Sequence, residues 1–239
     1  SDRSVLYRNN GDGTFTDVAR KAGMTGPDGG WATIWFDFDN DGDPDLYVTR
    51  EGWYAPAPNS LYRNNGDGTF TDIAKTAGVD DPQGTGFSAT VADFNLDGLL
   101  DIYVANGAPR VGTSNVLFMN QGNGKFREQA SQAGVSDRRR SIGTCSGDYN
   151  NDGYPDLYSV NVEGSILYKN NRDGTFTDVT AKAGVEQPIN TGYVCWFFDV
   201  NNDGWQDLFV SSWNSYQDFL ENKITGKSKG RGYRSVIYR

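Results

Sequence analysis

The sequence predicts an all-β protein made of repeated four-stranded units, and three observations lead to this prediction. A unit of about 55 residues recurs four times along the 239-residue chain. Short runs such as Thr-Phe-Thr and Leu-Tyr-Val alternate in the manner of half-buried strands. Turn-forming residues separate the runs, including many of the 30 Gly. Aromatic residues make up 13% of the chain, which is too many for a disordered acidic protein.

The repeats follow one order of phrases. Each copy opens with a phrase such as Leu6-Tyr7-Arg8-Asn9, turns through a Gly-containing loop to a Phe, and continues to an Ala-Gly-hydrophobic step. The copies occupy residues 4–58, 59–114, 115–164 and 165–220. Residues 221–239 hold an insertion and the start of a fifth copy, because Ser235–Arg239 resembles Ser4–Arg8.

Four strands are expected in each copy. The turn Asn10-Gly11-Asp12-Gly13 favours a hairpin, since Asn and Gly tolerate positive φ. Four short strands per repeat of this length are typical of a β-propeller blade, and a solenoid of β-sheets is the alternative. We therefore expect residues 1–239 to form a single β-propeller domain or propeller segment, with one blade per copy. In the first copy the strands are expected near Val5–Arg8, Thr14–Val18, Ala32–Phe38 and Asp45–Thr49, with a helical turn around Val18–Lys21.

An acidic loop between the third and fourth expected strands of each copy carries the candidate chemistry. Asp stands at position 1, Asp or Asn at 3, Asp at 5, Gly at 6 and Asp at 9. Oxygen donors at alternating positions converge when the chain curls, and the residue at position 7 can offer its carbonyl. The predicted metal ligands are Asp37, Asp39, Asp41, Asp43 and Asp45; Asp93, Asn95, Asp97, Leu99 and Asp101; Asp148, Asn150, Asp152, Tyr154 and Asp156; and Asp199, Asn201, Asp203, Trp205 and Asp207.

The donor set predicts Ca²⁺, with about four ions bound, one per loop. Carboxylates this close together repel one another strongly without a cation. Mg²⁺ is disfavoured because it usually keeps several waters. An EF-hand is excluded, since position 12 is Val48, Val104, Ser159 or Val210 and the flanking sequence is strand-like. The alternative is a set of Asx-rich turns that bind no ion.

These phrases resemble the FG-GAP/VCBS repeat family, which includes the propellers of integrin α-subunits and proteins of the ASPIC/UnbV type. The resemblance rests on Leu-Tyr-Arg-Asn-Asn-Gly-Asp-Gly-Thr-Phe-Thr-Asp at 6–17 and 61–72, and on the acidic loops. It implies a secreted, periplasmic or cell-surface β-propeller in which calcium rigidifies hairpins on one face. Related propellers often have seven or eight blades, so the resemblance also implies part of a larger ring. It does not imply one activity.

The composition of the chain argues against several classes of function. The chain has no His, which removes the usual general base and zinc ligand, and no apolar run approaches the ~20 residues of a membrane span. The net charge of −9 argues against nucleic acid as a partner. Cys145 and Cys195 can form at most one bridge. They fall on neighbouring third strands with a one-residue offset, which places them on opposite faces and favours two separate buried thiols over that bridge.

The preferred function is a calcium-binding extracellular scaffold for protein interaction or adhesion. A carbohydrate-binding lectin is the second hypothesis, and a glycan-active lyase or dehydratase is the third; no catalytic residue is predicted. A protein or glycan partner would bind the variable connectors between copies, and the oligomeric state is left open. The connectors carry Trp53, Tyr54, Trp213 and Tyr216, the basic run Arg138–Arg140, and the lysine- and arginine-rich segment after Asp207.

Overall fold

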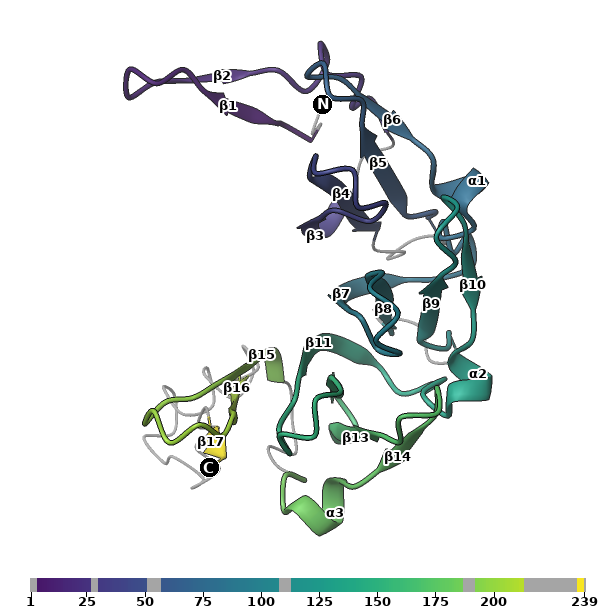
Figure 1. Cartoon of the computed structure of the whole chain (residues 1–239), viewed down its shortest axis with the longest axis vertical. Helices are drawn as coiled ribbons and strands as arrows, with labels where there is room; N and C mark the ends of the chain where they lie inside the picture. The colour runs from purple at the N-terminus through teal and green to yellow at the C-terminus, as the bar shows by residue number, and fades with distance from the viewer. Residues whose placement is uncertain are drawn as a thin grey trace, which may run out of the picture.

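Five antiparallel sheets follow one another along an open arc in the computed structural model (Figure 1). The structure describes residues 4–26, 30–50, 57–107, 113–186, 192–212 and 236–238. Three sheets have four strands each: β3 (Gly30–Phe36), β4 (Asp45–Arg50), β5 (Ser60–Asn64) and β6 (Phe70–Asp72); β7 (Gly86–Ala92), β8 (Asp101–Asn106), β9 (Val116–Asn120) and β10 (Phe126–Glu128); and β11 (Ser141–Gly147), β12 (Asp156–Asn161), β13 (Ile166–Asn170) and β14 (Phe176–Asp178).

Smaller sheets lie at the two ends of the arc (Figure 1). The hairpin of β1 (Tyr7–Asn9) and β2 (Phe15–Asp17) forms a two-stranded sheet at one end. The other end is a three-stranded sheet of β15 (Gly192–Phe198), β16 (Asp207–Ser212) and β17 (Val236–Tyr238). The all-β prediction and its repeated four-stranded sheets are confirmed.

The sheets are out of phase with the sequence repeats. The sheet β3–β6 takes β3 and β4 from the first repeat and β5 and β6 from the second, and the next two four-stranded sheets are built in the same way. The expectation that the four strands of one copy form one blade is therefore wrong. The opening phrase of a copy pairs instead with the last strand of the preceding copy, as Leu61 pairs with Tyr47.

Neighbouring sheets pack through their first strands, β3 against β7, β7 against β11 and β11 against β15. Between the first two four-stranded sheets the buried core includes Tyr47, Leu61 and Val79 from one side and Ile102 and Phe118 from the other. Burial of these large apolar side chains supplies the main force that holds one sheet on the next.

A helical turn connects each sheet to the following one. The turn predicted near Val18–Lys21 is present, with the Ala22 N–H donating to the Val18 carbonyl at 2.8 Å. The later copies form short helices there, and each ends at a glycine with positive φ, such as Gly78 at 82°. A Cβ on Gly78 would make only ordinary contact with the Phe126 carbonyl oxygen, at 3.4 Å, so the positive φ is the reason for glycine at this position. The helices are α1 (Ala74–Ala77), α2 (Ala130–Ala133) and α3 (Thr180–Ala183).

Cys145 and Cys195 form a disulfide, so the prediction of two separate thiols is wrong. Their Cα atoms lie 5.8 Å apart, and the bridge joins β11 to β15. Cys145 pairs in register with Tyr158, whereas Cys195 pairs with Val210, one step further along its partner strand. The offset does place the two side chains on opposite faces of their own sheets. Successive blades stack front to back, however, so opposite faces are the ones that meet.

Candidate metal centre

The four acidic loops join β3 to β4, β7 to β8, β11 to β12 and β15 to β16, and they share one backbone conformation. Position 4 has positive φ in every loop: 57° at Asn40, 57° at Leu96, 52° at Asn151 and 59° at Asn202. The glycine at position 6 also has positive φ, between 85° at Gly98 and 91° at Gly42. Glycine adopts this geometry without steric cost, which explains why it recurs at position 6.

The position-1 aspartates accept hydrogen bonds from backbone N–H groups further along the same loop. Asp37 accepts hydrogen bonds from the backbone N–H groups of Asp41 (3.2 Å) and Gly42 (2.9 Å). The same pair of bonds recurs in the other loops, around Asp93, Asp148 and Asp199. The position-5 aspartates accept from the N–H of position 7, as Asp97 does from Leu99 at 2.9 Å. These bonds curl each loop around the carboxylates.

The position-9 aspartates are buried and tie the loop to the sheet. Asp45 accepts from the Phe38 N–H (3.1 Å) and, through its other oxygen, from the Asn64 N–H (2.8 Å). Burial raises the pKa of Asp45 to about 6, although these two hydrogen bonds pull in the other direction. Burial likewise raises the pKa of Asp101 and of Asp156 to about 7. Removing a carboxylate from water disfavours its charge, and a bound cation would offset that cost.

In the first loop three predicted ligands converge. One carboxylate oxygen from each of Asp37, Asp39 and Asp45 lies within 4.8 Å of the others. Burial, followed by the charges of Asp41 and Asp37, raises the pKa of Asp39. Asp43 points elsewhere, because its Oδ2 lies beside Gly66, where an added Cβ would be 3.1 Å away. The structure therefore brings Asp37, Asp39 and Asp45 together and directs Asp43 toward the β5–β6 turn.

The asparagines at position 3 differ between loops. In the second and fourth loops Nδ2 of Asn95 and of Asn201 donates to the position-5 carboxylate at 2.9 Å. In the third loop Asn150 Nδ2 donates instead to Asp156 at 3.1 Å, and Asn150 Oδ1 is buried with no hydrogen-bond partner. An unpartnered buried oxygen beside carboxylates lacks a donor or a cation. The donor set, made entirely of hard oxygens, fits Ca²⁺.

The position-7 residues were predicted to contribute carbonyl oxygens, and their side chains differ widely. Trp205 is 54% exposed, and Leu99 contacts the next hairpin, where a Cβ on Gly122 would lie 3.1 Å from Leu99 Cδ1. Tyr154 lies under the guanidinium of Arg172, 5.6 Å from its ring centroid. The carbonyl-ligand assignment at these positions stays a prediction.

The first two acidic loops are each bonded to the following sheet by an asparagine that the sequence analysis did not single out. Asn120 Nδ2 donates to the Phe38 carbonyl and Asn170 Nδ2 to the Phe94 carbonyl, both at 2.8 Å and both buried. Each bond holds the start of one acidic loop against the following sheet. An asparagine ends the opening phrase of every copy, at 9, 64, 120 and 170, and this recurrence was the available signal.

Most of the connector residues singled out from the sequence lie outside the described residues, including Trp53, Tyr54, Trp213 and Tyr216. The basic run Arg138–Arg140 is described, and two of its three arginines form ion pairs within the chain. Arg139 forms an ion pair with Asp137 at 3.1 Å, and Arg140 forms one with Glu163. Both arginines therefore have acidic partners within the chain. Among the described residues, no helix is long and apolar enough to cross a membrane.

The repeated antiparallel sheets and the shared acidic hairpin loop define a repeat protein of the β-propeller class. The chain belongs to the FG-GAP family: the model of the FG-GAP-like repeat matches residues 1–48, 52–104, 93–159 and 148–210.

Relatives in sequence include cartilage acidic protein 1. The human protein is 40% identical over 90 residues, which is 38% of this chain and 13% of that protein. The protein from Xenopus tropicalis is 35% identical over 120 residues, or 49% of this chain and 18% of that protein. The matched part of this chain thus corresponds to less than a fifth of these relatives' length.

Two solved structures resemble the chain in fold. One is an Agrocybe aegerita lectin that recognises non-reducing terminal N-acetylglucosamine, with a TM-score of 0.49 and 21% identity, covering 88% of this chain and 57% of the lectin. The other is a putative exo-beta-1,3-galactanase from Bifidobacterium bifidum, with a TM-score of 0.45 and 16% identity, covering 77% of this chain and 62% of that protein.

Proposed function

We propose that the acidic loops bind calcium and that the protein acts as a calcium-stabilised extracellular scaffold. The observation that carries the proposal is the first loop, where oxygens of Asp37, Asp39 and Asp45 lie within 4.8 Å of one another. The unpartnered Asn150 Oδ1 supports the same role for the third loop. In each loop the ion would be bound by side-chain oxygens from positions 1, 3, 5 and 9. The backbone carbonyl of position 7 would complete the set of calcium ligands.

Calcium would act on the architecture, because the first two loops each contact two sheets. The position-9 carboxylate holds the next strand of its own sheet, and the carbonyl at position 2, of Phe38 or Phe94, accepts the Asn120 or Asn170 amide from the following sheet. An ion that fixes the loop therefore fixes the angle between blades. Rigid blades suit a surface that binds protein partners through its connectors.

We propose a secreted, periplasmic or cell-surface location. The Cys145–Cys195 bridge supports an oxidising compartment, where disulfides persist. The proposal includes no catalysed reaction.

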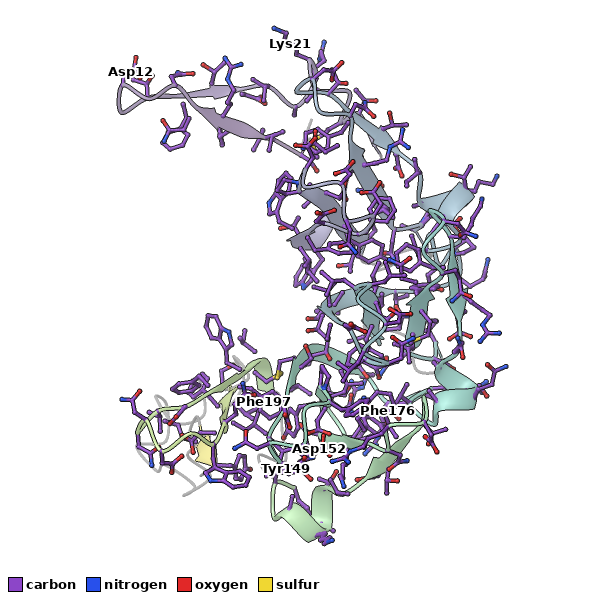
Figure 2. The ribbon with its side chains drawn as sticks, in the orientation of Figure 1. Asp12, Lys21, Tyr149, Asp152, Phe176 and Phe197 are labelled. Carbon is purple, nitrogen blue, oxygen red and sulfur yellow. A yellow bond between two sulfur atoms is a disulfide. The ribbon has the colours of Figure 1, made fainter. Side chains whose placement is uncertain are left out.

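Calorimetric titration of metal-free protein with Ca²⁺ tests the proposal, with thermal unfolding followed in parallel. We expect about four ions per chain and a large rise in Tm, since a ligand that binds only the native state stabilises it. D37N and D93N should each remove one ion. D12N is the control with the same charge change, because Asp12 lies at the tip of the β1–β2 hairpin, away from the acidic loops (Figure 2). Absence of binding would leave the loops as simple turns.

A second candidate, glycan binding, is favoured by a pocket beside the fourth loop. The pocket has a volume of about 450 Å³ and lies between the β11–β14 sheet and the β15–β17 sheet. Its lining combines the aromatic rings of Tyr149, Phe197 and Trp205 with the polar groups of Asp203 and Gln206 (Figure 2 labels Tyr149 and Phe197). Aromatic faces beside hydrogen-bonding groups are suited to sugar rings. A glycan array on wild type and W205A would test this candidate: glycan binding that W205A abolishes would support it.

A further inference from the structure

Arg172 breaks the pattern of the turn that precedes the fourth strand of each complete sheet. The equivalent positions in the other copies are Gly11, Gly66 and Gly122, and all three have positive φ. Arg172 keeps the same backbone geometry, with φ at 68°. A residue with a Cβ is strained in this region, so the arginine is held there at a steric cost. Its side chain must supply something that the glycines of the other copies do not.

The side chain of Arg172 reaches the third acidic loop. Its Nη2 atom lies 3.2 Å from Oδ2 of Asp152, the position-5 carboxylate, and its guanidinium carbon lies 5.6 Å from the ring centroid of Tyr154 at position 7. Asp152, which is labelled in Figure 2, is 10% exposed in its side chain. Its Oδ2 atom is buried with no hydrogen bond. The charge of Arg172 is therefore the contact that compensates this oxygen. Stacking on the tyrosine keeps the guanidinium in place.

The contact replaces one that the neighbouring loops make internally. In the second and fourth loops the position-5 Oδ2 accepts the amide of the position-3 asparagine, from Asn95 and Asn201. In the third loop Asn150 Nδ2 donates to Asp156 instead, and the Oδ2 atom of Asp152 contacts Arg172. Three features thus coincide in this loop alone: the arginine on a glycine position, the rotated asparagine and the unpartnered Asn150 Oδ1.

We propose that Arg172 is a tethered cation that competes with calcium for Asp152 and makes the third loop the weakest of the four sites. The inference rests on the proposed calcium binding. An ion in this loop needs Asp152, so Arg172 must withdraw before the ion is fully coordinated. The third loop has three carboxylates at its ligand positions, as the second and fourth loops do, and the arginine reduces the net negative charge of the third loop below theirs. Calcium affinity falls as ligand charge falls.

The third loop is therefore the site that fills last as calcium rises. Among the described residues, the other three loops have no ion pair like Arg172–Asp152, so they hold their ions at lower concentration, while the third loop keeps this contact until calcium displaces it. Since the pair is partly exposed, its strength is modest, and we expect a difference of about tenfold in Kd between the third loop and the others.

The test compares R172G, R172A and wild type by calorimetric Ca²⁺ titration. R172G restores the residue of the other copies, whereas R172A removes the charge and retains the strained backbone. Wild type should show one weak ion, and both variants should tighten that ion by about tenfold. Adding D148N to R172G should abolish the tightened ion, which assigns it to the third loop. R127A, which removes an exposed arginine on β10, should leave all affinities unchanged.

The outcomes separate the two proposals. If wild type binds calcium but R172G and R172A leave the weak ion unchanged or weaken it further, Arg172 is a structural clamp and this inference is wrong. Tightening in R172G alone would assign the effect to backbone strain and would also overturn competition by charge. If no protein in the series binds calcium, the proposed function falls together with this inference.

Discussion

Asp101 at the start of β8 accepts a 2.8 Å hydrogen bond from the backbone N–H of Asn120, which ends the neighbouring strand β9. Its other oxygen accepts from the Phe94 N–H at 3.0 Å, inside the acidic loop. A single buried carboxylate thus joins the loop, its own strand and the next strand. The sheet depends on this side chain whether or not a metal is bound.

Replacing Asp101 by Asn should destabilise the protein even without metal. One carboxamide group cannot accept both hydrogen bonds, and its NH₂ would face a backbone N–H. We expect a loss of about 1–3 kcal/mol in the free energy of unfolding. Urea unfolding in metal-free buffer measures it, with D12N on the exposed hairpin as the matched control. Equal stability of D101N and D12N would contradict a structural role for the carboxylate.

Stability of the metal-free protein should fall as pH rises from about 4 to 7. The pKa values of Asp101 and Asp156 are raised to about 7, whereas the pKa of an aspartate in the unfolded chain is about 4. Across that window the folded state binds more protons than the unfolded state, so the free energy of unfolding decreases with pH. Measuring Tm at pH 5 and at pH 8 in metal-free buffer tests this, and we expect the lower Tm at pH 8.

Calcium should reverse that trend, because it binds the ionised carboxylates and is favoured at higher pH. The same Tm series with saturating Ca²⁺ should therefore show no decline between pH 5 and pH 8. A metal-free protein that becomes more stable over this range would show that the buried aspartates do not control the pH dependence.

Leu96→Asn should stabilise the second loop. Leu96 has φ at 57° and is 48% exposed, so it bears the strain of the left-handed region without a packing benefit. Asn40 and Asn151 occupy this position in the first and third loops and donate to the Gly98 and Gly204 carbonyls of the following sheets. We expect a gain of about 1 kcal/mol from relieved strain and a new interloop bond.

The reverse substitution, Asn40→Leu, is the matched control and should destabilise by a similar amount. The Tm values of both variants and of wild type, measured by thermal unfolding, test this prediction. If both substitutions change Tm in the same direction, the asparagine preference at position 4 has another origin.

Removing the disulfide should weaken the attachment of the last sheet. The bridge closes a loop across a sequence separation of 50 residues, and chain entropy assigns such a crosslink about 4 kcal/mol. The pair C145A/C195A should therefore unfold at lower temperature than wild type in the absence of reductant. Hydrogen exchange should rise first in β15 and β16. If exchange rises equally in β3 and β4, the bridge stabilises the whole chain and not the last sheet in particular.

Strand positions and turn chemistry could be predicted because they are local. The predicted strands Ala32–Phe38 and Asp45–Thr49 overlap β3 and β4, and the left-handed turns fall on the repeated glycines and asparagines. The convergence of Asp37, Asp39 and Asp45 also follows from spacing within one loop.

Three features could not be predicted because they depend on packing between repeats. A periodic sequence has no marked origin, so the pairing of Tyr47 with Leu61 across a repeat boundary could not be inferred from spacing. The Cys145–Cys195 bridge required knowing that sheets stack front to back. The contact of Arg172 with Asp152 joins two strand connections whose proximity is set by the sheet.

The phase difference between repeats and sheets bears on how this molecule can be cut or extended. A fragment that ends at residue 58 or 114 would separate β4 from β5 or β8 from β9 and leave open strand edges, which invite aggregation. Boundaries after β6, β10 or β14 would leave each sheet whole. Each four-stranded sheet takes two strands from each of two consecutive copies, so a fragment cut at both copy boundaries, such as 59–114, contains no complete sheet.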